Sequence, residues 1–222
     1  MTGTPDTDLV FINEEFQTAA VKPEQLDMLL ADGWRHFGTH FFRYNLAIYH
    51  DEIRRVIPLR IRLSDFQLSK SQRRVLKRNQ DLRTVIRPIA ITVESDALFH
   101  CHKQRFDHGT PASIYDFLSR EPGSVPNEGG EIAVYRDQTL VAVSYFDTGL
   151  ATISGIYAVF DPDEHKRRLG IFTMLKEIEH SIETGREFYY QGYAYEGESF
   201  YDYKKRFSAL ERFDWEGNWM PM

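Results

Sequence analysis

Residues 153–185 read ISGIYAVFDPDEHKRRLGIFTMLKEIEHSIETG. The first eight alternate as a half-buried strand does, and residues 171–178 form an amphipathic run, so the stretch predicts a strand that feeds a helix ending at a glycine. An Asp-Pro pair at 161–162 is typical of a helix N-cap and first turn. The free N–H groups of such a helix start can hold a phosphate or a developing negative charge, and an ordinary ligand-free connection fits the stretch equally well.

The segments on either side extend this unit into a sheet. Residues 131–135 and 140–146 predict a hairpin before it, and residues 188–193 predict a strand after it. Three strands, a helix and a further strand follow one another in the order of the GNAT acyltransferase fold. Residues 121–130, rich in Gly and Pro, form the one clear linker, and we therefore expect two halves: a basic first half, 1–125, and a second half, 126–222.

The composition is that of an ordinary soluble chain, with 42% apolar and 27% charged residues. No run approaches the ~18–20 apolar residues of a membrane span, and the first residues lack the pattern of a signal peptide, so we expect a cytoplasmic protein without a membrane partner. The single cysteine, Cys101, excludes an internal disulfide, and we expect it to be a small core residue. His100 and His102 lack a third ligand at a metal-binding spacing.

The net charge of −6 conceals a strong asymmetry. Residues 54–87 hold eleven Lys or Arg and two Asp or Glu, a local charge of +9, whereas the rest of the chain carries −15. Residues 54–63 alternate cations with apolar residues, which predicts a strand with one exposed basic face that includes Arg60. A helix capped by Ser69 follows, and its cations project from one side. Phosphates are the natural partner of such a surface, although a solvated helix face is the simpler interpretation. The four helix cations are Arg73, Arg74, Lys77 and Arg78.

Short sequence words recur in a fixed order along more than half of the chain. They are Gly-Trp-Arg (33–35), Pro-Leu-Arg (58–60), Ser-x-Ser-Gln-Arg-Arg-Val-Leu-x-Arg-Asn-x-Asp-Leu (69–82), Val-Ser-Tyr-Phe-Asp (143–147), Tyr-x-x-Phe-Asp-Pro-Asp (157–163), Leu-Gly-x-Phe-Thr-x-Leu-x-Glu-Ile (169–178), Tyr-Tyr-x-Gly-Tyr (189–193) and Tyr-Lys-x-Arg-Phe (203–207). In this order and spacing they resemble the bacterial aminoacyl-tRNA–protein transferases. Those enzymes are arginyl- or leucyl-transferases of the N-degron pathway, and they move an amino acid from tRNA onto a protein N-terminus.

The resemblance implies an α+β protein in which a C-terminal GNAT-like half packs on a smaller, degenerate GNAT-like N-terminal half that contacts tRNA. It implies that the second half, 126–222, is catalytic, with an aminoacyl-tRNA donor, a protein or peptide N-terminus as acceptor, and arginine or leucine as the transferred group. We expect no cofactor, because the donor ester is already activated. It adds Lys103 and Arg105 to the tRNA contacts. The matching words also place four residues at the substrate: Trp34, Arg35, Ser144 and Phe146.

The chain departs from that family between the Gly-Trp-Arg and Pro-Leu-Arg words, where the transferases usually carry a cysteine cluster linked to metal or iron–sulfur binding. Residues 44–57 contain no cysteine, so we expect no metal there. Because this region lies near the acceptor in the family, a small peptide or a specialised metabolite is an alternative acceptor.

The implied reaction is the attack of an amine on an amino-acid ester. The acceptor ammonium must lose a proton, the tetrahedral oxyanion must meet hydrogen-bond donors, and the ribose hydroxyl must be reprotonated. Six of the 12 tyrosines fall between residues 189 and 203, at the end of the predicted sheet, although alternating tyrosines are also typical of simple packing. The catalytic candidates are Tyr190, Gln191, Tyr193, Tyr157 and Asp161.

Charged residues near the C-terminus complete the predicted site. Lys204 and Arg206 suit either an acidic acceptor or the phosphates of the acceptor stem, and Glu196 and Glu198 are candidate partners of an arginyl side chain. Two other functions remain open from the sequence. Residues 167–170 loosely resemble the pyrophosphate-binding turn of an acyl-CoA-dependent GNAT enzyme, although Phe172 stands where glycine or alanine is usual. A non-catalytic tRNA-binding relative is the third hypothesis.

Overall fold

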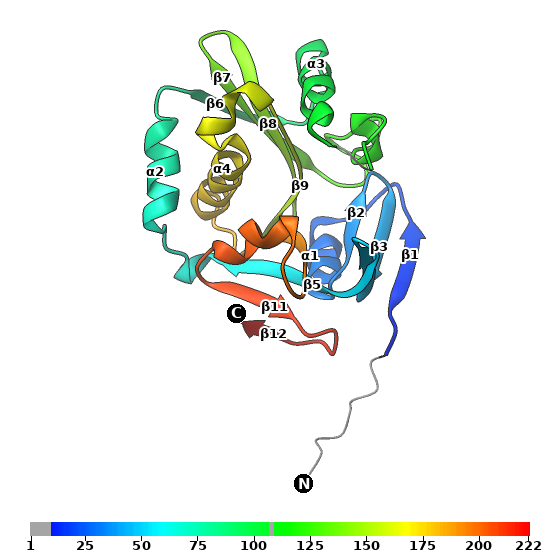
Figure 1. Ribbon diagram of the computed structural model, residues 1–222. Helices are drawn as coiled ribbons and strands as arrows, with labels where there is room; N and C mark the ends of the chain where they lie inside the picture. Colours follow the sequence, from blue (N-terminus) through cyan, green and yellow to red (C-terminus); the bar gives the residue numbers. More distant parts are fainter. Residues whose placement is uncertain (1–9, 107–108) are drawn as a thin grey trace.

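The computed structural model describes residues 10–106 and 109–222 (Figure 1). Its strands are β1 (Asn13–Gln17), β2 (Arg35–Phe37), β3 (His40–Tyr44), β4 (Leu46–Tyr49), β5 (Glu52–Arg62), β6 (Arg83–Pro88), β7 (Gly129–Arg136), β8 (Thr139–Thr148), β9 (Thr152–Phe160), β10 (Phe188–Tyr195), β11 (Leu210–Phe213) and β12 (Trp219–Pro221). Its α-helices are α1 (Pro23–Ala31), α2 (Lys70–Arg78), α3 (Val93–His102) and α4 (Leu169–Glu183). Short 3₁₀ helices are η1 (Leu63–Asp65), η2 (Lys103–Arg105), η3 (Ile114–Asp116), η4 (Pro162–Arg167) and η5 (Phe200–Arg206).

One large sheet organises the described residues. Its strands run in the order β12-β11-β5-β10-β9-β8-β7-β6, with β4 paired to β5 beside this path, and a separate small sheet has the order β1-β3-β2. Strands β5 and β6 come from the first half of the chain and hydrogen bond with strands of the second half. The boundary at residue 125 stays a prediction, and the two halves share this sheet.

The centre of the sheet holds a parallel pair, β9 and β10. Parallel neighbours need a crossover, which η4 and α4 supply here. The two strands pair only from Thr152 to Ser154 on β9 and from Phe188 to Tyr190 on β10. Beyond these residues β10 bulges at Gly192 against β5 and the strands part. A parallel pair that opens in this way, after an antiparallel β7-β8-β9 meander, is the arrangement of a GNAT-like fold.

Helices cover both faces of the large sheet (Figure 1). Helices α2 and α4 lie on one face, where Val75 and Leu175 join the core formed with Ile132 and Ile153. On the other face Phe99 of α3 packs with the side chains of β7, β8 and β9. A third cluster joins α1, β3 and Tyr190 of β10. Within the part of the chain that the structure describes, no helix is long and apolar enough to cross a membrane.

Several local predictions are confirmed. The strand, helix and hairpin expected around residues 131–185 correspond to β9, α4 and the β7–β8 hairpin. The predicted Ser69 cap is present, because its hydroxyl accepts a hydrogen bond from the Gln72 N–H at 3.2 Å while the Gln72 side chain accepts from the Ser69 N–H at 2.8 Å. This capping box fixes where the basic helix α2 begins.

Other local predictions are wrong. The strand β9 does not feed α4 directly: Asp161 caps η4, and Arg168 then takes a left-handed conformation (φ 57°) before α4 begins. The strand β5 has no continuous exposed basic face, because Phe188 of β10 and Glu211 of β11 contact Arg60, which is only 8% exposed. Cys101 is exposed, since α3 turns its neighbours Phe99 and His102 inward instead.

Candidate active site

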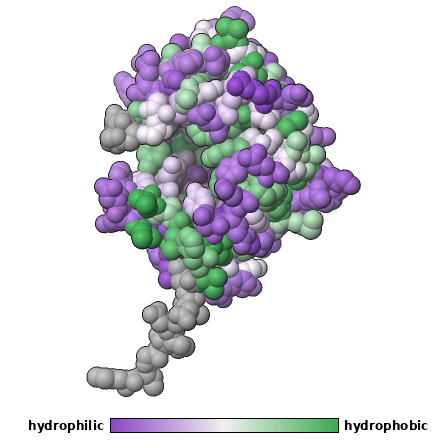
Figure 2. Space-filling view, turned by 90° about the vertical axis from the view of Figure 1, so that its right-hand side faces the viewer, coloured by the Kyte–Doolittle hydropathy of each residue, from purple (hydrophilic) through white to green (hydrophobic). Residues whose placement is uncertain are grey.

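A cleft of about 730 Å³ opens where β9 and β10 part. Its walls are residues 155–158 of β9, the start of α4, the side chains of Tyr189 and Gln191 on β10, and the inner side of η5. The face shown in Figure 2 is hollowed near its centre, with hydrophobic and hydrophilic residues meeting at the rim. A second hollow of about 670 Å³ over α1 is lined mostly by apolar residues. The cleft is the candidate active site, because polar groups from several elements converge on it.

Arg35 of β2 closes the gap at the head of the cleft. Its Nη2 donates a hydrogen bond to the carbonyl oxygen of Gly155 at 2.6 Å. Gly155 is the first residue of β9 beyond the stretch that pairs with β10. Nη1 of Arg35 is buried without a hydrogen-bond partner among the described residues. Gly155 has no room for a side chain, since a Cβ there would lie 2.8 Å from the Tyr189 hydroxyl. The splayed strands therefore depend on an arginine from outside the GNAT-like core.

Glu177 of α4 reaches the same point from the opposite side. The Tyr189 hydroxyl donates to its Oε2 at 2.6 Å, and the hydroxyl of Ser144 on β8 lies beside it. Burial raises the pKa of Glu177 to about 7, although the Ser144 and Tyr189 hydroxyls lower it in part. The cleft thus holds a carboxyl group that changes its charge near neutral pH.

Lys204 of η5 is the second group in the cleft with a displaced pKa. Burial, together with the nearby positive charge of Arg35, lowers the pKa of Lys204 to about 7. Its Nζ donates to the carbonyl oxygen of Tyr193 at 2.9 Å. Groups with strongly displaced pKa values cluster in catalytic clefts, and Glu177 and Lys204 are two such groups in this one.

The five catalytic candidates separate into two sets. Gln191 and Tyr157 line the cleft. Tyr190 and Tyr193 point away from it: the Tyr190 hydroxyl accepts from Arg60 at 3.3 Å, and the Tyr193 hydroxyl donates to the carbonyl oxygen of Gly33 at 2.6 Å. Neighbouring residues of a strand face opposite sides, so Tyr189 takes the place that the sequence suggested for Tyr190.

The fifth candidate, Asp161, has a structural contact instead. Its Oδ1 accepts from the Asp163 N–H at 2.9 Å and caps η4. The hydroxyl of Tyr157, in contrast, has no partner among the described residues, and burial raises the pKa of Tyr157 to about 12. Its ring is held by stacking on Phe117 with centroids 3.8 Å apart. Tyr157 therefore keeps a protonated hydroxyl, buried in the wall of the cleft, at neutral pH.

The residues predicted to contact substrate are scattered. Lys204 lines the cleft, and Arg35 lies at its head. Arg206 is exposed and does not line it. Phe146 belongs to the core on the α4 face, and Trp34 packs with the cluster around α1. The cleft also excludes Glu196 and Glu198, which are exposed beside Arg54.

The predicted tRNA contacts also divide. Arg60 is buried, pairs with Glu211 at 2.6 Å, and lies 3.9 Å from the centre of the Phe188 ring. The side chain of Lys103 donates to the carbonyl oxygen of Ala112 at 3.1 Å. Arg105 lies at the cleft over the ring of Phe160, at 4.6 Å. Four of the seven predicted contacts are exposed on α2: Arg73, Arg74, Lys77 and Arg78.

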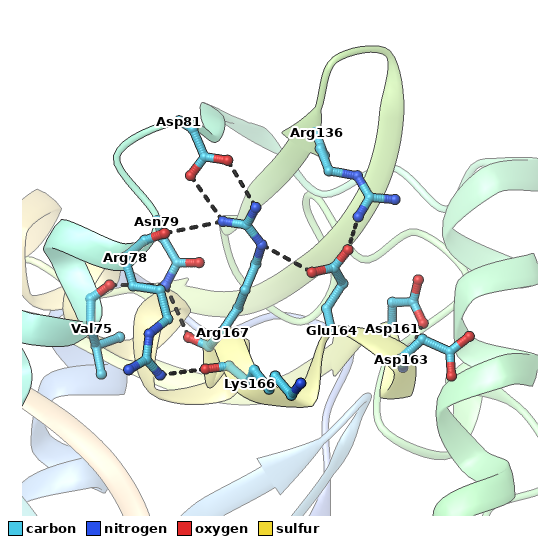
Figure 3. Close-up of polar contacts among 10 residues, drawn as sticks. All are labelled: Val75, Arg78, Asn79, Asp81, Arg136, Asp161, Asp163, Glu164, Lys166 and Arg167. Atoms are coloured by element: carbon cyan, nitrogen blue, oxygen red, sulfur yellow. Dashed lines mark hydrogen bonds and ion pairs between the residues drawn. The ribbon is translucent and has the colours of Figure 1, made fainter.

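A polar network ties α2 to the mouth of the cleft (Figure 3). Arg167 of η4 makes two hydrogen bonds to the Asp81 carboxylate, at 2.9 and 2.8 Å, and a third to Glu164 at 2.9 Å. Arg78 donates to the carbonyl oxygen of Lys166, and Asn79 donates to that of Arg167 at 3.0 Å. Because His165 and Arg168 line the cleft, the end of the basic helix and the cleft mouth share one segment of chain.

Sequence reasoning missed Glu177 and Tyr189. A signal was present, because Thr173, Glu177 and Ser181 are spaced by four and form a polar stripe on the apolar face of α4. All three are at most 2% exposed. A carboxyl group at such a position needs a buried partner, which Tyr189 provides.

The cysteine-free segment forms the β4–β5 hairpin beside the cleft. The Tyr49 hydroxyl accepts from the Phe200 N–H at 2.9 Å, and its ring lies 4.9 Å from that of Tyr195. An aromatic contact thus supports η5 at this position.

Family models match most of the chain. Residues 96–214 match the model of the family described as "Arginine-tRNA-protein transferase, C terminus", and residues 5–74 match the model of its N terminus.

Curated relatives agree with this match. An aspartate/glutamate leucyltransferase of Acinetobacter baumannii is 28% identical over 207 residues, covering 91% of this chain and 73% of the relative. Proteins of the same name from Nitrobacter winogradskyi and Xanthomonas campestris pv. campestris are 30% and 32% identical, covering 84% and 74% of this chain and 75% and 69% of each relative.

Solved structures share the fold at low identity. L-PGS from Bacillus licheniformis superposes with a TM-score of 0.50 and 12% identity, covering 72% of this chain and 60% of that one. The C-terminal domain (DUF2156) of a protein described as a lysylphosphatidylglycerol synthetase, from Agrobacterium fabrum, gives a TM-score of 0.52 and 16% identity, covering 65% of this chain and 49% of that one. With the sheet topology, these likenesses confirm the predicted α+β, GNAT-like fold.

Proposed function

The chain belongs to the arginine-tRNA-protein transferase family of aminoacyltransferases, and we propose that it moves an amino acid from the 3′ end of a charged tRNA onto the α-amino group of a protein or peptide. One observation carries the proposal: a cleft with buried acid–base groups adjoins the exposed cations of α2 through η4. A tRNA held on α2 would present its esterified end to the cleft mouth.

The cleft supplies the groups that an ester aminolysis needs. The donor ester is already activated, so binding, orientation and proton transfer suffice. Tyr157 and the Gln191 amide are the groups in the cleft that can polarise the ester and hold the tetrahedral intermediate. Donors aimed at a developing oxyanion each contribute roughly 3–4 kcal/mol to the transition state. Tyr190, Tyr193 and Asp161 have no part in this proposal, because each has a structural contact away from the cleft.

We assign leucine as the transferred group in preference to arginine. The inner cleft is lined by apolar side chains that suit a branched aliphatic group, among them Ile156, Leu169 and Met174. Glu177, the carboxyl group in the cleft, already accepts a hydrogen bond from Tyr189 and is largely protonated below pH 7. The relatives reported above are named leucyltransferases, which agrees with this assignment.

The acceptor we propose begins with aspartate or glutamate. Arg105 and Arg168 line the mouth of the cleft and supply positive charge for an acidic first side chain. The names of the relatives carry the same two amino acids. A peptide end, rather than an internal residue, suits a cleft of about 730 Å³.

The test is a panel of radiolabelled aminoacyl-tRNAs incubated with peptides that differ only in their first residue. We expect transfer from leucyl-tRNA to peptides beginning with Asp or Glu, and little from arginyl-tRNA. Arginine transfer would overturn the donor assignment, and equal transfer to Ala peptides would overturn the acceptor assignment. Normal tRNA binding without any transfer would favour a non-catalytic relative, and tight calorimetric binding of acetyl-CoA would favour an acyl-CoA enzyme.

A further inference from the structure

Lys204 owes its place in the cleft to the 3₁₀ geometry of η5. Residues three apart lie one above the other in such a helix, so Tyr201 and Lys204 share the face toward the cleft. The outward pair, Asp202 and Lys205, forms an ion pair at 2.8 Å. The backbone oxygen of Lys204 accepts from Gln191 Nε2 at 2.9 Å, which fixes η5 to β10.

The surroundings of Lys204 disfavour its charged form. Among the described residues it has no ion-pair partner, its Nζ donates to the Tyr193 carbonyl oxygen, and the centre of the Tyr201 ring lies 5.1 Å from Nζ. A Cβ on Gly192 would lie 3.1 Å from Nζ and 3.7 Å from Arg35 Nη2, so the two basic groups approach the same open backbone position. The titratable or charged groups on the packed elements are Arg35, Glu177, Tyr157, His102, Arg105, Tyr189, Tyr193, Tyr201 and Tyr203.

We propose that Lys204 is the general base that takes the proton from the acceptor's α-ammonium group, an inference that rests on the proposed aminoacyl transfer. Neutral Lys204 removes one ammonium proton, and the free amine forms a C–N bond with the ester carbonyl carbon while the carbonyl electron pair moves to oxygen. When the intermediate collapses, the C–O bond to the ribose breaks and Lys204 returns its proton to the departing oxygen. The second proton of the new amide nitrogen leaves to solvent, so charge and atoms balance.

The proton transfer has a physical need. A free α-amino group has a pKa near 7.7–8.0, so most acceptor ends arrive as ammonium ions at pH 7. An ammonium ion next to Arg35 is repelled, and a neutral lysine there both avoids further repulsion and accepts the proton. A pKa of about 7 for Lys204 matches the task, because the base must be neutral in a large fraction of molecules and still bind a proton.

Other groups in the cleft are poorer bases. Nδ1 of His102 is engaged with the Phe160 backbone at 3.0 Å, and burial lowers the pKa of His102 to about 4. Glu177 accepts the Tyr189 hydroxyl at 2.6 Å. His165 is exposed at the rim.

The experiment compares two nucleophiles in single-turnover transfer from charged tRNA between pH 5.5 and 9. One is an acceptor peptide, which must lose a proton, and the other is hydroxylamine, whose nitrogen is already neutral at pH 7. The variants are Lys204→Gln and Lys204→Arg, and Lys205→Gln is the matched control on the outer face of η5. Circular dichroism and melting verify that each variant is folded.

We expect both Lys204 variants to lower kcat with the peptide about 100-fold or more at pH 7, with KM for the peptide changed less than about 3-fold. Arginine cannot substitute, because its guanidinium is not deprotonated in proteins. With hydroxylamine, both variants should stay within about 5-fold of the wild-type rate. When the variants transfer to the peptide, the pH dependence of the rate should reflect only the ionisation of the acceptor amine.

Three results would overturn the inference: equal loss with both nucleophiles, full activity of Lys204→Arg, or an effect confined to KM for acidic peptides. The first would make Lys204 a structural or donor-binding residue, and the other two would make it a positive charge that binds substrate. A wild-type protein inactive with every donor and nucleophile would instead refute the proposed function itself, and the base assignment with it.

Discussion

Replacing Glu177 by glutamine tests how the cleft is built. The carboxyl group of Glu177 is 2% exposed and accepts the Tyr189 hydroxyl at 2.6 Å, a contact that the glutamine oxygen can keep. What the substitution removes is the ionisation. Because burial raises the pKa of Glu177 from 4.5 to about 7, the folded protein binds the Glu177 proton more tightly than the unfolded chain does.

The sign and size of the effect follow from this difference. Between pH 4.5 and 7 the folded state holds more protons at Glu177, so its contribution to the free energy of unfolding falls as pH rises through that window. Integrated from pH 5 to pH 8, the loss is about 2–3 kcal/mol, taking 1.36 kcal/mol per pKa unit. For a chain of this size that corresponds to roughly 5–10 °C in Tm.

Guanidinium unfolding of wild type and Glu177→Gln at pH 5, 6, 7 and 8 measures the change. Between pH 5 and pH 8 the free energy of unfolding of the variant should rise by about 2–3 kcal/mol relative to that of the wild type, because the variant lacks the buried charge that the wild type acquires. Glu183→Gln, on the exposed end of α4, is the control, and its free energy of unfolding should differ from that of the wild type by the same amount at all four pH values. If the difference in free energy of unfolding between Glu177→Gln and the wild type is also independent of pH, the cleft does not raise the pKa of Glu177 and this reasoning is wrong.

Three further substitutions separate the roles of other residues. Replacing Arg74 and Lys77 by alanine should reduce the slope of log Kd for tRNA against log salt by about 2, measured by filter binding; an unchanged slope would place the tRNA elsewhere. Arg60→Ala should leave that slope unchanged but lower the free energy of unfolding by about 2–3 kcal/mol in denaturant titrations, because the buried Glu211 loses the buried one of its two arginine partners. Gly155→Ala should lower kcat about 10-fold in the transfer assay and lower the free energy of unfolding by about 1–3 kcal/mol, since its methyl group would displace the Tyr189 hydroxyl. A wild-type kcat would show that the point where β9 and β10 separate tolerates a side chain.

The backbone of residues 126–222 was predictable because its signals are local. Alternation in residues 131–146 and 153–160 and the amphipathic run of α4 identify their elements without tertiary information. The strand β5 shows the limit of this reasoning. Its alternating cations are typical of a half-exposed strand, yet β10 and β11 flank it and Glu211 neutralises Arg60 from another strand. Sequence spacing cannot show that a partner 151 positions away will be there.

The site was harder to predict than the fold, for a geometric reason. The tyrosine-rich segment was recognised, but which tyrosines face the cleft depends on the phase of β10. Tyr189 and Gln191 point to one side and Tyr190 to the other, and the bulge at Gly192 alters the phase again before Tyr193. A shift of one residue exchanges a packing residue for a cleft residue.

The 3₁₀ segment η4 links the two surfaces that the proposal needs. Arg167 points inward and holds Asp81 and Glu164, so its charge is neutralised by the fold (Figure 3). Lys166 and Arg168, on either side of it, are exposed, and no ion pair among the described residues involves them. One arginine therefore anchors α2 to the cleft mouth, and its two neighbours continue the positive surface from α2 toward the cleft. A donor held by α2 must pass η4 to react, so losing the Asp81 contact should impair transfer while the cations of α2 remain in place.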